Sequence, residues 1–161
     1  MKILFLPTGG TIDKDYPHTT KGWAFEFGEP AVVRLLERLN PSFEYDILVP
    51  FQKDSLEISD EDRQKLVDTI NQHQADAYII THGTDTMIET GQYLAQFFPG
   101  KIIVLTGAMR PERFQNSDAP INLGMALGAV NLLQSGVYVA MHGVLKSADA
   151  MQRDMKSGKF Y

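Results

Sequence analysis

Two short polar motifs in this sequence carry the side chains best suited to chemistry. The first, Thr8 to Thr11, places two glycines between threonines, and the second, Thr81 to Thr86, contains a Thr-Asp pair. A third polar stretch contains Asp54-Ser55. Hydroxyls, carboxylates and nearby helix N-termini are the groups needed to bind a small zwitterion and to attack a carbonyl carbon. Together the three stretches indicate a site of that kind.

Each motif also has an interpretation without catalysis. The glycines of Thr8 to Thr11 suit a structural turn at the end of a strand as well as a close approach of the backbone to a ligand. Thr84 or Asp85 could cap the helix that follows them. The sequence lacks GxGxxG and GxxxxGK[ST], which disfavours a dinucleotide site and a P-loop, and no metal-ligand spacing such as HExxH joins the four histidines His18, His73, His82 and His142.

The elements that must position these motifs alternate along the chain. Short, branched apolar runs predict strands that are buried on both faces of a sheet. Between them, apolar residues at helical spacing predict helices, and Ser59 with Asp62 forms an acidic variant of the capping box. Such alternation implies a doubly wound, mostly parallel α/β sheet. The predicted strands are Ile3 to Leu6, Tyr45 to Val49, Ala77 to Ile80, Ile102 to Leu105 and Val137 to Met141, and the helices are Pro30 to Leu39, Ser59 to Gln72, Thr86 to Phe97 and Asn122 to Gln134.

The polar motifs all follow predicted strands. In open parallel sheets, ligands bind beyond the carboxyl ends of the strands. We therefore expect the loops after the first four strands to meet at one edge and to form one site.

Length and composition limit the remaining possibilities. With 161 residues, 43% hydrophobic content and a net charge of -5, the chain fits one globular domain and has no basic surface suited to nucleic acid. The basic stretch Lys146 to Lys159 is interrupted by acids and is interpreted as a solvated face. Cysteine is absent, and no apolar run reaches the length of a signal or membrane segment, so we expect a cytoplasmic protein without membrane contact.

The wording and order of three motifs resemble the N-terminal, catalytic-type domain of bacterial L-asparaginases. Asp54-Ser55 resembles the substrate-binding loop of that family, and Ser117 to Leu123 resembles the stretch after its third motif. The similarity spans nearly the whole chain and implies the same fold. The motifs are ILFLPTGGTI at Ile3 to Ile12, THGTDTM at Thr81 to Met87 and VLTGAMRP at Val104 to Pro111.

The resemblance implies a cofactor-free hydrolysis of L-asparagine to L-aspartate and ammonia, without a metal. Thr11 corresponds to the family's nucleophile, and Tyr16 is the nearest match to a tyrosine that assists it. Asp85 matches the aspartate that binds the substrate's α-amino group, and Thr84 the threonine that handles protons together with a lysine. The implied substrate-binding residues are Gly10, Asp54, Ser55, Leu56, Gly83, Thr84, Asp85 and Ala108.

Two departures from the family pattern stand out. Arg153 falls at the position of the family's lysine, and an arginine is essentially never deprotonated, so it cannot act as a base. It is interpreted either as part of the catalytic group or as an exposed cation near a helix end. Family members also continue into a second, smaller domain, which is absent from residues 1–161, so we expect a single domain that forms a homo-oligomer. These departures keep open a second hypothesis, a non-catalytic module that binds a small amino acid or amide.

Overall fold

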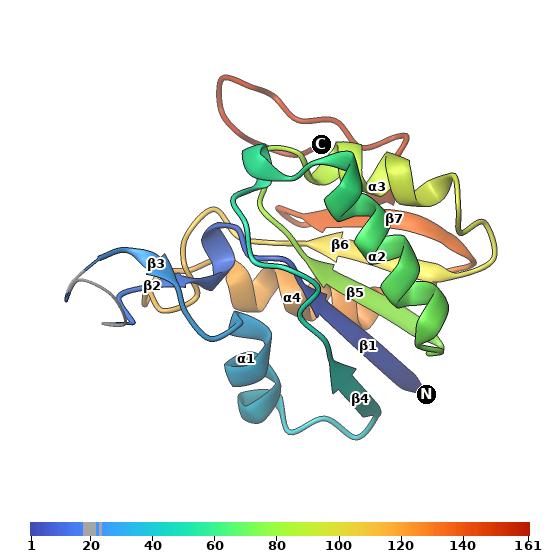
Figure 1. Ribbon diagram of the computed structural model, residues 1–161, viewed down its shortest axis with the longest axis horizontal. Coiled ribbons are helices and arrows are strands. Elements are labelled where there is room, and N and C mark those ends of the chain that lie inside the picture. Colours follow the sequence, from blue (N-terminus) through green and yellow to red (C-terminus); the bar gives the residue numbers. More distant parts are fainter. Residues whose placement is uncertain (18–21, 23) are drawn as a thin grey trace.

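The chain folds around one six-stranded sheet with helices on both faces (Figure 1). This computed structural model describes residues 1–17, 22 and 24–161, so His18 and part of the predicted loop Asp13 to Phe27 lie outside the described residues. Along the sheet the strands follow the order β4 (Glu44–Ile47), β1 (Lys2–Pro7), β5 (Ala77–Thr81), β6 (Ile102–Thr106), β7 (Gly136–Met141) and β8 (Val144–Ser147). All neighbours are parallel except β7 and β8. The predicted doubly wound, mostly parallel α/β fold is confirmed.

All five predicted strands are present, but one differs in character. Every residue of β5 is buried, as expected for an interior strand, whereas Glu44, Tyr45 and Asp46 of β4 are exposed because β4 lies at the edge of the sheet. The antiparallel strand β8 and the small hairpin of β2 (Lys14–Asp15) and β3 (Glu26–Phe27) were not predicted. The main sheet consists of β1 (Lys2–Pro7), β4 (Glu44–Ile47), β5 (Ala77–Thr81), β6 (Ile102–Thr106), β7 (Gly136–Met141) and β8 (Val144–Ser147).

The four predicted helices are also present, although the last is displaced. The prediction of Asn122 to Gln134 is wrong at both ends, since α4 begins at Ala119 with Pro120 in its first turn. Proline suits that position, but the apolar residues surround α4 on all sides, so periodicity did not mark its ends. The helices are α1 (Ala31–Leu39), α2 (Asp60–Gln72), α3 (Met87–Ala95) and α4 (Ala119–Ala129), with short 3-10 turns η1 (Thr11–Asp13) and η2 (Ser55–Glu57).

Two apolar layers hold the helices against the sheet. Leu66 and Ile70 of α2 and Leu94 of α3 pack on one face with alternate residues of β1, β5, β6 and β7. On the other face, Leu36 of α1 and Leu123 of α4 pack against the remaining alternate residues of the same strands. The central strands are therefore buried on both sides, which fixes their register and the positions of the loops that follow them.

The predicted capping box at the start of α2 is confirmed. The Ser59 hydroxyl accepts a hydrogen bond from Asp62 N at 3.3 Å, and the Asp62 carboxylate accepts one from Ser59 N at 3.1 Å. Replacing Ser59 with alanine leaves Asp62 N without this acceptor and is expected to lower the free energy of unfolding by about 1 kcal/mol. Urea denaturation measures the change. Ser135→Ala, at an exposed position, serves as the control; equal losses in both variants would argue against the cap.

The order of the parallel strands creates a position where the site is expected to form. In the sheet, β1 lies between β4 and β5. The chain therefore passes from β1 to β4 on one side and then continues to β5 on the other side of β1. Ligands bind in open α/β sheets at the carboxyl ends of strands beside such a switch point. The Thr8 to Thr11 motif follows β1, and Thr84-Asp85 follows β5, so both lie there.

Candidate functional site

Three loops at the carboxyl edge of the sheet contact one another at small residues. Gly10 lies directly against Gly83, because a Cβ atom on Gly10 would overlap the Gly83 backbone. Gly83 lies against Ser55 in turn, since a Cβ atom on Gly83 would come within 2.7 Å of the Ser55 Cβ and Oγ atoms. Gly10 N also donates to Lys53 O at 3.0 Å. The loops after β1, β4 and β5 therefore meet, and these are three of the four loops that the sequence predicted to form the site.

Thr11 begins η1, immediately after Gly10. Gly10 has a φ of 78° and a ψ of -178°, a conformation that turns the chain sharply out of the sheet edge. The turn is closed by a hydrogen bond from Asp13 N to Gly10 O at 3.2 Å. Thr11 is half-buried, and within residues 1–17, 22 and 24–161 its hydroxyl has no hydrogen-bond partner and is not sealed from solvent. The hydroxyl is thus free to contact a ligand.

The Thr84-Asp85 pair lies in the turn between β5 and α3. Ser55 supports this turn from one side: Asp85 N donates to Ser55 Oγ at 3.2 Å, and the Thr86 hydroxyl donates to Ser55 O at 2.7 Å. The alternative that Thr84 or Asp85 caps α3 is wrong, since Thr86 holds the N-cap position, with no side-chain capping bond. Thr84 is buried, and the Asp85 carboxylate is about half exposed.

Arg153 supports the same turn from the other side. Its Nη1 donates to Thr84 O and to Asp85 Oδ1, both at 2.9 Å. The interpretation of Arg153 as an exposed cation near a helix end is therefore wrong: its side chain is only 13% exposed and lies in a β-bridge with Phe160. Arg153 thus contacts both residues of the Thr84-Asp85 pair, although it reaches Thr84 through the backbone oxygen and not through the hydroxyl.

The remaining predicted binding residues differ in what they offer a ligand. The Asp54 carboxylate is paired with Lys14 at 2.8 Å, a contact for which the sequence gives no signal. Leu56 is 77% exposed beside Ser55 in η2. The side chain of Ala108 is buried in the core, so this residue can reach a ligand only through its backbone.

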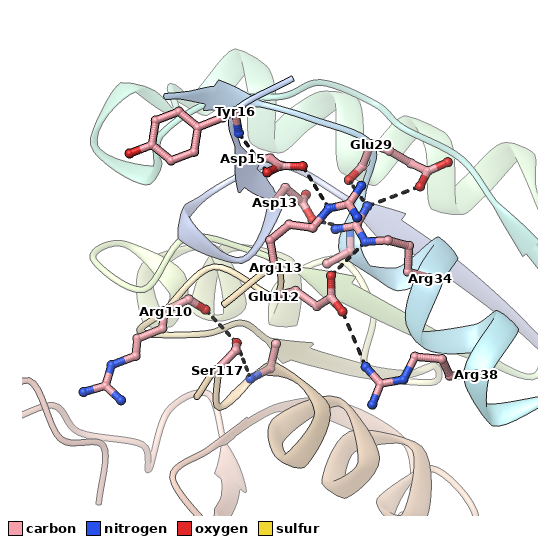
Figure 2. A network of polar contacts seen from close by, with 12 residues as sticks. Asp13, Asp15, Tyr16, Glu29, Arg34, Arg38, Arg110, Glu112, Arg113 and Ser117 are labelled. Carbon is pink, nitrogen blue, oxygen red and sulfur yellow. Dashed lines mark hydrogen bonds and ion pairs between the residues drawn. The ribbon is translucent and has the colours of Figure 1, made fainter. Parts of the chain in front are cut away.

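Tyr16 lies farther out, after β2. Its backbone N donates to Asp15 Oδ1 at 2.8 Å, and its ring packs against Phe25 with centroids 5.2 Å apart. The side chain is 44% exposed, and Figure 2 shows it directed away from the neighbouring polar network. The structure does not place the phenol against Thr11, so the assistance by Tyr16 stays a prediction.

Two buried titratable residues beside these motifs were not singled out as functional by the sequence. Asp13 accepts a hydrogen bond from Ala31 N at 2.7 Å, while its Oδ2 has no partner among the described residues (Figure 2). Burial raises the pKa of Asp13 to about 7. Burial likewise lowers the pKa of His82 to about 4, so its ring is neutral at pH 7, with Nδ1 bonded to Gly83 O at 2.7 Å. His82 is thus a packed residue.

The geometry gathers a free hydroxyl, a half-exposed carboxylate and a guanidinium at the switch point of the sheet. The same stretches match a known family: residues 2–159 fit the model described as Asparaginase, N-terminal. The chain belongs to the asparaginase family. Within the described residues of this asparaginase domain, no group of three or more His, Asp or Glu is arranged to hold a metal ion, and no helix is long and apolar enough to span a membrane.

Relatives of known sequence and structure agree with this assignment. The domain is 33% identical over 156 residues to a probable periplasmic L-asparaginase of Haemophilus influenzae, covering 91% of this chain and 44% of that protein. It is 29% identical to a glutaminase-asparaginase of Acinetobacter glutaminasificans, covering 97% and 49% of the two chains. The thermostable L-asparaginase of Thermococcus kodakarensis superposes with a TM-score of 0.84 and 30% identity, covering 95% and 48%. The asparaginase domain thus spans about half the length of the relatives it matches.

Proposed function

We propose that this domain hydrolyses the side-chain amide of L-asparagine, giving L-aspartate and ammonia, with Thr11 as the nucleophile. The observation that carries the proposal is the meeting of the Thr11 turn with the Thr84-Asp85 turn through Gly10 and Gly83. The family match supports the activity, and the free hydroxyl of Thr11 supports the choice of nucleophile.

The proposed reaction proceeds in two steps. The Thr11 oxygen attacks the amide carbon, the carbon–nitrogen bond breaks, and the nitrogen leaves as ammonia with the proton from the hydroxyl. Water then hydrolyses the β-aspartyl ester, which releases aspartate and restores the hydroxyl. Asp85 binds the substrate's α-ammonium group, Thr84 helps transfer protons, and Tyr16 assists Thr11. No cofactor takes part.

The test is ammonia release from L-asparagine, L-glutamine and their D-forms. Thr11→Ala is expected to lower kcat roughly 10³-fold or more, because the covalent intermediate cannot form. Thr11→Ser retains a hydroxyl and is expected to keep part of the activity, while Thr69→Ala, half-buried on α2 with its hydroxyl donating to Lys65 O, is the control. Equal activity of Thr11→Ala and the unmodified protein would rule out the proposal. Glutamine belongs in the panel because one methylene changes pocket binding by only about 1–3 kcal/mol.

Arg153 favours a second candidate, a module that binds an amino acid without converting it. Its guanidinium occupies both Thr84 O and Asp85 Oδ1, and it cannot accept a proton. Calorimetric binding of L-aspartate by a protein that releases no ammonia would favour this function. Turnover that is lost in Thr11→Ala would eliminate it.

We further propose that the protein acts in the cytoplasm as a homo-oligomer whose second copy helps to enclose the site. The support is that the site residues lie in loops at an open sheet edge, with Asp85 and Leu56 exposed. One relative is named as periplasmic, so fractionation of cells is the direct measurement of location. Sedimentation analysis of the purified protein measures the number of chains.

A further inference from the structure

A cavity of about 430 Å³ lies between α1 and the loop 112–117 that follows β6. Within the described part of the chain, no residue assigned to the proposed reaction lines it. Its wall combines guanidinium groups and one carboxylate with apolar surface. The lining residues that a ligand would meet include Arg34, Arg38, Glu112, Arg113, Phe114 and Pro120. The cavity is therefore a candidate site separate from Thr11.

The loop on one side of this cavity is held in place by its own hydrogen bonds. Glu112 N donates to Ile12 O at 3.1 Å, which fixes the start of the loop. Ser117 N donates to Phe114 O at 2.9 Å, and the Ser117 hydroxyl donates to Arg110 O at 2.9 Å. The cavity is thus formed before a ligand arrives, as small-molecule sites usually are.

Two arginines of α1 keep unused donors at the cavity (Figure 2). Arg34 donates from Nε to Glu112 at 2.8 Å and pairs through Nη1 with Glu29 at 3.2 Å. Its Nη2 has no hydrogen-bond partner in residues 1–17, 22 and 24–161. Arg38 Nη1 lies 3.6 Å from Glu112, beyond hydrogen-bonding distance, and its side chain is 68% exposed. Both guanidiniums are therefore able to donate to a further anion.

Arg113 adds a third guanidinium from the loop. Its Nε pairs with Asp15 Oδ2 at 2.8 Å, whereas neither of its Nη atoms has a partner among the described residues. Asp15 and Glu29 do not line the cavity, so three positive charges line it against the single negative charge of Glu112. Guanidinium groups form charge-assisted, often bidentate hydrogen bonds with carboxylates and phosphates. This lining favours an anionic group.

An apolar groove of about 240 Å³ continues from the cavity along α1 and α4. Arg38 and Pro120 line both spaces, so the two adjoin. The groove is open at Gly124, where an added Cβ atom would meet nothing within 4 Å. A hydrocarbon chain placed here removes apolar surface from water, which is favourable. The apolar side chains of the groove are Leu35, Leu39, Leu123 and Leu127.

We propose that the cavity and the groove together bind a single-chain anionic amphiphile. Its carboxylate or phosphate head is held by Arg34, Arg38 and Arg113, and its hydrocarbon chain lies between α1 and α4. A bare anion would leave the leucines uncovered, and a neutral chain would leave the guanidinium donors unused. Such a site lies outside the proposed function, because it uses no residue of the Thr11 site and requires no turnover.

Calorimetry with short-chain probes tests the head and the chain separately. Octanoate is expected to bind at least about tenfold more tightly than acetate, since each fully buried methylene contributes roughly fourfold to the affinity. It is also expected to bind at least about tenfold more tightly than octylammonium, which the guanidiniums repel. Octyl phosphate, titrated in parallel, shows which of the two heads is preferred. Equal affinities of octanoate and acetate, or of octanoate and octylammonium, would overturn the proposal.

Gly124→Leu fills the groove without changing an arginine. The affinity of this variant for octanoate is expected to fall at least about tenfold. Gly128→Leu is the matched control, since Gly128 is an exposed residue of the same helix that does not line the groove. An added Cβ atom meets nothing within 4 Å at either glycine, so both variants are expected to fold. Equal octanoate affinities of the two variants would contradict a chain bound in the groove.

Arg38→Gln removes one charge at the junction of the cavity and the groove. Its affinity for octanoate is expected to fall at least about fivefold, because a charge-assisted hydrogen bond to the head is lost. Lys146→Gln removes an equal charge at an exposed position of β8 and is expected to bind octanoate as the unmodified protein does. Losses of the same size in both variants would show a general charge effect and no bound head group.

A second copy of the chain is the other occupant that these variants detect. If no amphiphile binds and Gly124→Leu changes the number of chains measured by sedimentation, the proposal is wrong and the groove is a contact between copies. Absence of binding with an unchanged number of chains would also overturn it. Loss or retention of ammonia release in Thr11→Ala has no bearing on these titrations, so the two proposals fail independently.

Discussion

Gly10→Ala is expected to destabilise the protein by about 3 kcal/mol or more and to abolish ammonia release. At Gly10 the backbone adopts a φ of 78° with a ψ of -178°, a region that residues with a Cβ atom essentially do not occupy. The added Cβ atom would also overlap the backbone of Gly83. Backbone strain and steric overlap therefore act together at a single position.

The expected loss of activity in Gly10→Ala follows from a displacement of the two turns that carry the site residues. If Gly83 gives way, the Thr11 turn and the Thr84-Asp85 turn move apart, and Ser55, packed on the other side of Gly83, is displaced as well. A shift of about 1 Å in such a site is enough to reduce catalysis 100-fold.

Gly124→Ala provides the matched control. Gly124 lies inside α4, where an added Cβ atom meets nothing within 4 Å. This change is expected to increase the free energy of unfolding by up to about 1 kcal/mol, since alanine favours a helix. Denaturant titration measures stability, and the ammonia assay measures activity. A Gly10→Ala protein as stable and active as the Gly124→Ala protein would contradict the close packing of the two turns.

Asp13→Asn is expected to make the protein more stable than the unmodified chain at pH 8, by up to about 4 kcal/mol. Burial raises the pKa of Asp13 from 3.8 to about 7 in the folded state. The folded protein therefore holds this proton more tightly than the unfolded chain, and stability falls as the pH rises from about 4 to about 7. The asparagine side chain at position 13 does not ionise, so the free energy of unfolding of the variant does not decrease over this pH range.

The charges around Asp13 explain why its neutral form fits. The positive charge of Arg34 acts on Asp13, but Arg34 Nε is already bonded to Glu112 Oε2 at 2.8 Å and its Nη1 pairs with Glu29 at 3.2 Å (Figure 2). Arg38 Nη1 lies 3.6 Å from Glu112 Oε1. Two guanidiniums thus face two carboxylates, and an ionised Asp13 would add an unbalanced buried charge.

The comparison is made by denaturation across the range from pH 4 to pH 9. Asparagine keeps the oxygen that accepts from Ala31 N and places an N–H group where the protonated carboxyl carries its proton. The stability advantage of Asp13→Asn is expected to shrink toward pH 4. Asp15→Asn, beside it in β2, removes a carboxylate that is paired with Arg113 and is expected to give no such advantage at pH 8. A pH-independent difference for Asp13→Asn would contradict the neutral form.

Buried strands and the loops after them were predictable from sequence, because both are marked by residues that are adjacent in the chain. An unbroken apolar run such as β5 fits only an interior strand, and a motif directly after it must lie at the sheet edge. The positions of Thr11 and Thr84-Asp85 followed from that reasoning. Capping at Ser59 was predictable for the same reason, since both partners lie within one helical turn.

Features that depend on distant contacts were not predictable. Arg153 lies in a charged stretch that looks solvated in the sequence, and only the folding of the 153–160 hairpin against Asp85 buries it. The Lys14-Asp54 pair joins residues that are 40 positions apart. Asp13 follows Thr11 closely and could have been noted as a polar residue after Ile12, but its burial depends on α1.

The exposed edge strand β4 limits how copies of this chain can assemble. An unpaired edge invites a second sheet to continue it, but Glu44 and Asp46 place negative charges along β4, and Lys2 already pairs with Asp46 at 2.7 Å. Two antiparallel β4 strands would bring like charges together across the join, which destabilises such a pair. Pairing of two β4 edges is therefore disfavoured as a route by which copies of this chain would assemble.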